Sequence, residues 1–107
     1  MMRYLIPLEF MMLVQAGLPD DSNDRDIWRF AQKHGMILLT GNRRMIGKNS
    51  LERTIREENN ATSLPVLTIS NVKRMVERKY REQCKTQLLE VVLDLENYFG
   101  TGRIFIP

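Results

Sequence analysis

The sequence predicts an α/β domain with a mainly parallel sheet and helices on both faces. Two observations lead to this prediction. Residues 36–40 and 65–69 are apolar runs without polar alternation, so each is expected to be a strand covered on both faces, as in parallel sheets. Amphipathic helical segments alternate with the predicted strands, and such alternation favours right-handed crossovers between parallel strands. A three-layer architecture follows.

Composition suits one compact domain over residues 1–107, because 107 residues with 43% hydrophobic side chains can bury a core and argue against disorder. The formal net charge of +3 identifies no function by itself. Its distribution is more informative, since residues 43–85 hold 11 Lys/Arg against 5 Asp/Glu. A basic middle fits a surface that faces a polyanion, and solvated helix faces explain it equally well.

The chain lacks the residues that some classes of function require. Cys84 is the single cysteine, so an internal disulfide framework is excluded and a reducing compartment is compatible. With His34 as the single histidine, a zinc site or a Cys/His nucleophile pair has too few parts. Residues 4–14 are too short to span a bilayer and contain Pro7 and Glu9, so we expect a buried strand there and a cytoplasmic protein.

A capped helix is predicted after the loop at residues 20–23. Ser22 or Asn23 can cap it, and the carboxylates at positions 24 and 26 lie in the first turn, where the helix dipole favours negative charge. Spacings of three and four place Ile27, Phe30, Ala31 and His34 on one face. Gly35 stands where a left-handed C-cap is expected. We interpret Trp28 as a core or subunit-interface residue.

The strand predicted at residues 36–40 ends in a polar, basic loop. Ligands bind at the carboxyl ends of strands in open parallel sheets, so this loop is a candidate site. The loop resembles a phosphate-binding P-loop, but five residues rather than four separate Gly41 from Gly47, and Asn49 replaces the hydroxyl residue. A nucleotide P-loop is therefore not expected.

The rest of the chain predicts two helices and two strands. A capping-box-like Asn49-x-x-Glu52 begins a short helix that runs to about Glu58. A strand follows at residues 65–69, and a basic, irregular turn then leads into the last helix. The helix has an apolar stripe made of Tyr80, Cys84, Leu88, Val91, Val92, Leu95 and Tyr98. Residues 100–102 end it, and residues 103–106 form the final strand.

The segment from Ser22 to Arg44 carries a resemblance to a known family. It contains Asp24-x-x-Ile27, a helix ending in Ala31-x-x-x-Gly35, a hydrophobic strand, and then Thr40-x-Asn42-Arg43. This pattern resembles the second half of a PIN-like domain of the small bacterial, toxin-type group. The strand at 65–69, the long helix and the final strand are similar to the end of the same group, so the resemblance covers about residues 10–107.

The resemblance implies a site and a chemistry. In PIN ribonucleases, carboxylates at the strand ends bind Mg²⁺ or Mn²⁺ for RNA hydrolysis. By motif position, the catalytic residues are Asp24, Thr40 and Asn42, the metal ligands are Asp24 and Asn42, and the cofactor is Mg or Mn. The cations of the loop and the next helix suit phosphate binding; they are Arg43, Arg44, Lys48, Arg53 and Arg56.

Two interpretations follow from this resemblance. The first is a metal-dependent RNA endonuclease of PIN-like type, acting as the toxin of a toxin-antitoxin pair. The alternative is a catalytically degenerate PIN-like module that binds RNA or a protein partner through residues 43–56 and 73–85. Aromatic residues are few and lie in apolar stripes, so RNA binding is expected to be electrostatic and to weaken with salt.

The chain also departs from the PIN-like pattern. The group's most characteristic aspartate lies in a first strand, and this chain has room for a single strand before Pro19, which fits the second strand better. We therefore expect an amino-terminally shortened or degenerate member. Loss of a central strand would leave sheet edges unpaired, so self-association through a dimer or strand exchange is expected. A protein antitoxin is a further candidate partner, and no membrane partner is expected.

Overall fold

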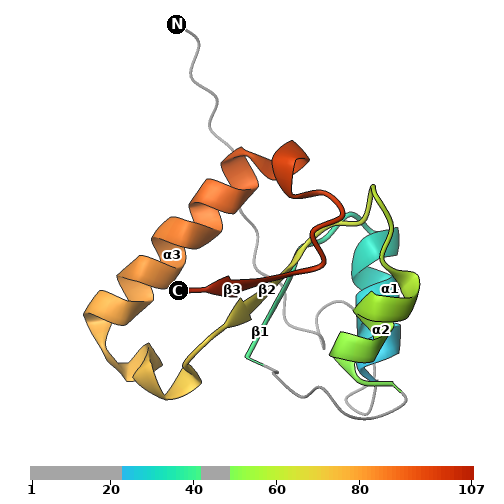
Figure 1. Ribbon diagram of the computed structural model, residues 1–107. Coiled ribbons are helices and arrows are strands. Elements are labelled where there is room, and N and C mark those ends of the chain that lie inside the picture. Colours follow the sequence, from blue (N-terminus) through green and yellow to red (C-terminus); the bar gives the residue numbers. More distant parts are fainter. Residues whose placement is uncertain (1–22, 42–48) are drawn as a thin grey trace, which may run out of the picture.

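Three short parallel strands organise the structure, a computed structural model that describes residues 23–41 and 49–107 (Figure 1). β1 (Leu38–Thr40) and β3 (Arg103–Ile106) both pair with the central β2 (Val66–Ile69), in the order β1-β2-β3. Both pairings are parallel. The predicted mixed α/β class with a parallel sheet is therefore confirmed. The strand predicted at residues 4–14 lies outside the described residues.

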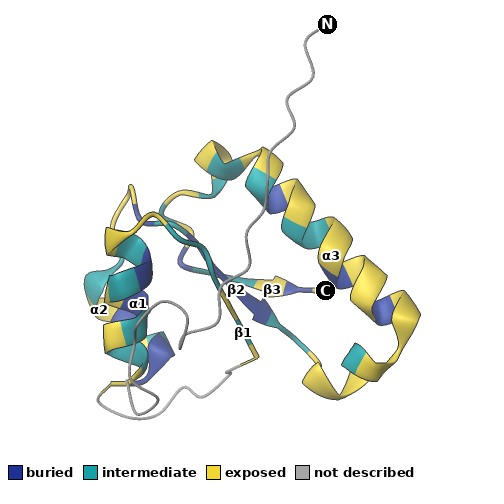
Figure 2. Cartoon of the chain, turned by 180° about the vertical axis from the view of Figure 1, so that it is seen from behind, coloured by how far each residue is buried: buried dark blue, intermediate teal, exposed yellow. Residues whose placement is uncertain are grey.

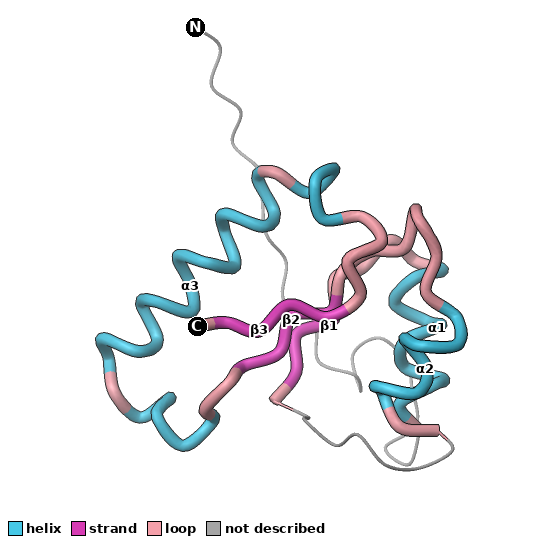
Figure 3. Tube along the Cα trace, viewed as in Figure 1, coloured by secondary structure: helices cyan, strands magenta, loops and turns pink. Residues whose placement is uncertain are grey.

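Each face of β2 packs against its own hydrophobic cluster. Successive strand residues point to opposite faces, and accordingly Val66 and Leu67, both fully buried, belong to different clusters. One cluster contains Leu67, Tyr80, Cys84, Val91 and Ile106, and the other contains Trp28, Leu51, Ile55 and Val66. In Figures 1 and 3, α3 (Arg78–Leu93) lies on one side of the sheet, with α1 (Asp24–Lys33) and α2 (Leu51–Glu58) on the other.

The caps of α1 are as predicted. The Asn23 side chain accepts a hydrogen bond of 2.9 Å from the backbone N–H of Asp26. At the other end, Gly35 has φ +66°, and the N–H of Met36 donates to the carbonyl of Ala31 at 2.8 Å. This is the Schellman arrangement, in which a left-handed residue satisfies the last carbonyls of a helix.

The buried face of α1 differs from the predicted one. Trp28 and Ala31 are buried, Ile27 and Phe30 are half-buried, and His34 is exposed at the C-cap. Phe30 and His34 do share a face, with ring centroids 4.3 Å apart, but the buried stripe is centred on Trp28 and Ala31. The interpretation of Trp28 as a core residue is confirmed by its 4% exposure.

β1 is shorter and less covered than its sequence suggests. The predicted strand begins at Met36, but the N–H of Met36 is used by the cap of α1, and pairing with β2 begins at Leu38. Leu39 is 38% exposed, so the prediction of burial on both faces is wrong for this strand. Its apolar run reflects one half-buried face and the residues that lead out of the helix.

α2 begins one residue later than the predicted capping box. Ser50, rather than Asn49, is the N-cap, and its hydroxyl accepts from the N–H of Arg53 at 3.2 Å. The helix ends at Glu58, as predicted. Asn59 then donates from its side chain to the carbonyl of Gly100 at 2.8 Å, which ties the end of α2 to the turn before β3.

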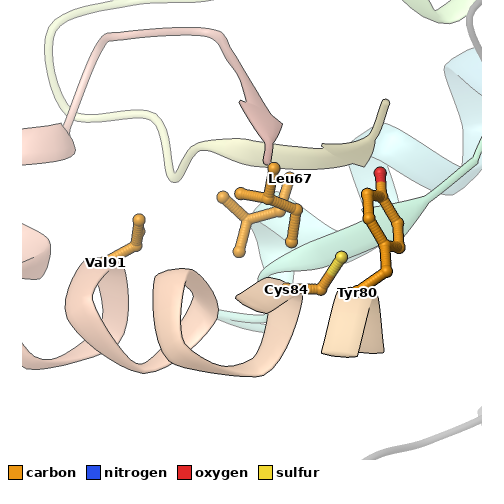
Figure 4. Close-up of a cluster of buried hydrophobic side chains, with 5 residues drawn as sticks. Leu67, Tyr80, Cys84 and Val91 are labelled. Carbon is orange, nitrogen blue, oxygen red and sulfur yellow. The ribbon is translucent and has the colours of Figure 1, made fainter. Parts of the chain in front are cut away.

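The basic lead-in to α3 is a 3-10 helix, η1 (Val72–Val76), as the predicted irregular turn suggested. The apolar stripe of α3 faces β2, and Figure 4 shows Tyr80 and Cys84 pointing from the helix toward Leu67. Cys84 is buried, which confirms its interpretation as a small buried side chain, and this burial raises the pKa of its thiol. A short 3-10 helix, η2 (Leu95–Tyr98), continues the stripe. Among the described helices, none is long and apolar enough to cross a bilayer.

Candidate functional site

Two threonines lie side by side toward the carboxyl end of the sheet. Thr40, the last residue of β1, stands opposite Thr68 of β2 in the parallel register. Both lie two residues beyond Leu38 and Val66, which pack in the cluster beneath α1 and α2, so the threonines face the same side. Thr68 is fully buried and Thr40 is half-buried. The hydroxyl predicted at the site is therefore placed at the edge where parallel sheets bind ligands.

A buried arginine reaches toward this row of threonines. The Arg103 side chain is 7% exposed, and its Nη1 donates to Oγ1 of Thr68 at 2.8 Å. Its Nε donates to Oε2 of Glu52, in the first turn of α2, at 3.2 Å. A buried guanidinium needs a carboxylate and further acceptors, and both are present here. The pair joins β3 to the beginning of α2.

Sequence reasoning did not select Arg103 or Glu52 as site residues. One signal was available for the arginine, since a charged residue opens an otherwise apolar strand, Arg103–Ile106. A long charged side chain in such a strand needs a partner inside the fold. No comparable signal marks Glu52, which looks like an ordinary first-turn acid until the helix is packed on the sheet.

The predicted nucleic-acid contacts of α2 are accessible. The side chains of Arg53 and Arg56 are 55% and 75% exposed. Each has an acid one turn away on the same helix, with separations of 3.5 Å between Arg53 and Glu57 and 4.0 Å between Arg56 and Glu52. Exposed pairs of this kind are weak, so both guanidinium groups remain available to a phosphate. The other predicted contacts, Arg43, Arg44 and Lys48, lie outside the described residues.

Two arginines of α1 are largely neutralised by α2. Arg25 donates to both Glu57 and Glu58, and Arg29 donates to Glu58 through Nε at 2.8 Å. The hydrogen bond from Arg29, with a second from Arg25, lowers the pKa of Glu58, and the hydrogen bond from Arg25 lowers that of Glu57. The charges of Arg25 and Arg29 are thus balanced by carboxylates that a helix distant in sequence supplies.

A polar hollow of about 320 Å³ lies between these two helices. It is lined by Arg25, Arg29, Asn49, Arg53 and Glu57. The carboxylates that bind the arginines reduce its net charge, so it is a weaker anion site than the number of arginines suggests.

The predicted metal ligands are only partly placed by the structure. Asp24 is half-buried in the first turn of α1, whereas Asn42 lies outside the described residues. Within residues 23–41 and 49–107, no three His, Cys, Asp or Glu side chains are grouped to hold a metal ion. The described donors by themselves do not fit a divalent cation, so no catalytic step through a metal is derived from them.

A cationic segment borders the carboxyl end of β1 from the other side. An added Cβ at Gly41 would lie 2.5 Å from Cγ2 of Val72, so η1 packs directly against the residue that follows Thr40. Lys73 is the next residue of η1 and is exposed. Lys73 of η1 therefore lies near the carboxyl end of β1.

Comparisons of the chain with protein-family models, curated proteins and solved structures give no match.

Proposed function

We propose that the chain is a PIN-like domain, with its sheet between two helical layers, that binds RNA across the carboxyl end of the sheet. The observation that carries the proposal is the position of two exposed arginines, Arg53 and Arg56, on the helix whose first turn is joined to the row of threonines through Glu52 and Arg103. Guanidinium groups suit phosphate oxygens, and a threonine hydroxyl can donate to them. The loop cations Arg43, Arg44 and Lys48 extend this predicted surface.

Binding to a labelled single-stranded RNA at low and high salt tests the proposal. We expect an affinity that falls steeply as salt rises, because phosphate contacts release counterions. The double variant Arg53→Ala/Arg56→Ala is expected to bind about fivefold or more weakly at low salt and to have a smaller salt slope. Lys33→Ala, which removes an exposed cation from the last turn of α1, is the matched control. Equal loss in the control would contradict a localised interface.

A second candidate is metal-dependent RNA hydrolysis of the PIN type, with Asp24, Thr40 and Asn42 as the catalytic residues. The position of Thr40 at the carboxyl end of β1, where the resemblance expects a hydroxyl, favours it. If Mg²⁺ or Mn²⁺ binds, it would supply Lewis-acid assistance to phosphodiester cleavage. This candidate also carries three further predictions: the chain acts as a toxin, it binds a protein antitoxin, and it self-associates.

Calorimetry with Mn²⁺ separates the two candidates. Saturable binding that is lost in Asp24→Ala and kept in Asp26→Ala would support hydrolysis, since both acids lie in the first turn of α1. Absence of binding, together with RNA affinity that is unchanged by EDTA, would leave the binding module as the function.

A further inference from the structure

A second surface lies on η1 and the first two turns of α3, and it combines exposed aliphatic side chains with cations. Val72 is 53% exposed and Val76 is 84% exposed. Four neighbouring cations are also exposed, and their side chains make no hydrogen bond or ion pair with any residue that the structure describes; they are Lys73, Arg78, Lys79 and Lys85. Figure 2 shows this end of α3 as largely exposed. We call it the η1–α3 surface.

The core holds the η1–α3 surface in one geometry. Met75, between the two valines, packs against the cluster beneath α3. The guanidinium of Arg74 lies 4.6 Å from the centre of the Tyr80 ring, and Nη1 of Arg81 donates to the carbonyl of Met75 at 2.8 Å. Val72 and Val76 are therefore exposed on a turn whose inward residue, Met75, is half-buried against the core.

The charge of this surface is strongly one-sided. Between residues 72 and 85 the sequence has six Lys/Arg and two Asp/Glu. One of the two acids, Glu77, is bound by Arg74, with 3.1 Å between Nε and Oε2. An arriving carboxylate would thus meet cations that have no competing partner in the described part of the chain.

The presence of exposed valines beside exposed cations favours one class of anionic partner over others. Phosphates would use the cations but gain nothing from the valines, and Tyr80, the aromatic residue of the segment, is 2% exposed and offers no stacking platform. Burial of aliphatic side chains beside charge pairs is characteristic of protein interfaces. We infer that the η1–α3 surface binds an acidic polypeptide that carries aliphatic side chains beside its carboxylates. This inference does not depend on RNA binding at α2.

Fluorescence anisotropy with two labelled synthetic peptides tests the inference. One peptide contains Glu and Leu, and the other is an all-Glu peptide of the same length. The full chain is expected to bind the Glu/Leu peptide more tightly. Val76→Ser is expected to weaken that binding about fivefold, because a buried valine is lost, and to leave all-Glu binding unchanged. Lys79→Glu is expected to weaken the binding of both peptides about tenfold at low salt.

Matched variants identify nonspecific effects. Leu93→Ser changes a 68%-exposed aliphatic residue at the other end of α3, and Lys33→Glu reverses an exposed cation on α1. Both are expected to bind the Glu/Leu peptide as the wild type does.

Equal affinity for the two peptides would overturn the inference in favour of a general polyanion surface. Loss of single-stranded RNA binding in Lys79→Glu without loss of peptide binding would assign the surface to RNA. Binding to anionic phospholipid vesicles that depends on Val76, without peptide binding, would assign it to a membrane.

Discussion

The phenolic oxygen of Tyr80 accepts a hydrogen bond of 2.9 Å from the backbone N–H of Asn71. Tyr80 belongs to the core on the α3 side of the sheet, while Asn71 directly precedes η1. The Asn71 side chain makes no capping bond to η1, so the tyrosine supplies the anchor at the beginning of this turn. One core side chain thus fixes where the exposed surface of η1 starts.

Tyr80→Phe is expected to lower the free energy of unfolding by about 1 kcal/mol, because it removes the acceptor of a partly buried N–H while keeping the ring. Urea denaturation measures the change. Tyr98→Phe is the control, since no hydrogen bond of the Tyr98 hydroxyl is found in the described part of the chain. Equal losses in the two variants would show that the bond to Asn71 has no special role.

Thr68→Val is expected to destabilise the fold by about 1.5–3 kcal/mol, because it removes an acceptor from the buried guanidinium of Arg103 without changing the side-chain shape. Chemical denaturation again gives the value. Thr86→Val, on the exposed side of α3, is expected to have a much smaller effect. A variant at position 68 as stable as the wild type would mean that another group satisfies the arginine.

The link between α1 and α2 is expected to weaken in acid. Hydrogen bonds from arginine hold the pKa values of Glu57 and Glu58 below their ordinary value of 4.5 in the folded chain. The unfolded chain therefore binds more protons near and below pH 4.5, and stability is lost as pH falls from 4.5 through the lowered values. Thermal melts between about pH 3 and pH 7 cover this window. The melting temperature of the double variant Glu57→Gln/Glu58→Gln should depend less on pH than that of the wild type. Identical pH profiles of the variant and the wild type would contradict a role of Glu57 and Glu58 in the loss of stability in acid.

Gly41→Ala is expected to displace η1, because the added Cβ would lie 2.5 Å from Cγ2 of Val72. The contact is with a half-exposed side chain, so a modest loss of about 1 kcal/mol is expected rather than unfolding. Val72→Ala removes the obstructing methyl. A double-mutant cycle of the two changes should therefore show a favourable coupling, and simple additivity would argue against the contact.

The sequence predicted local features of this fold well. Asn23 and Gly35 act through groups within a few residues, so their roles as caps follow from residue type and spacing. The stripe from Tyr80 to Val91 and the final strand were equally visible, because a 3.6-residue period and a glycine-bounded apolar run are local patterns.

Long-range pairing was not predictable in the same way. Arg29 looks like part of a solvated stripe until α2 brings Glu58 to it across 29 residues of sequence. Glu52 and Arg103 are 51 residues apart, and nothing local indicates that they meet. The strand end at Thr40 could therefore be found from a local pattern, while the buried pair of Arg103 and Glu52 could be found only in three dimensions.

The position of β2 between β1 and β3 has a consequence for how the chain folds. Its neighbour on one side, β3, is formed by residues 103–106, so half of the ladder of the central strand cannot close until that segment has been synthesised. Until then Leu67, fully buried in the finished fold, lacks the packing of Ile106. The sheet cannot be completed without residues 103–106, and a nascent chain that stops before β3 leaves one edge of β2 unpaired, where edge-to-edge aggregation can begin.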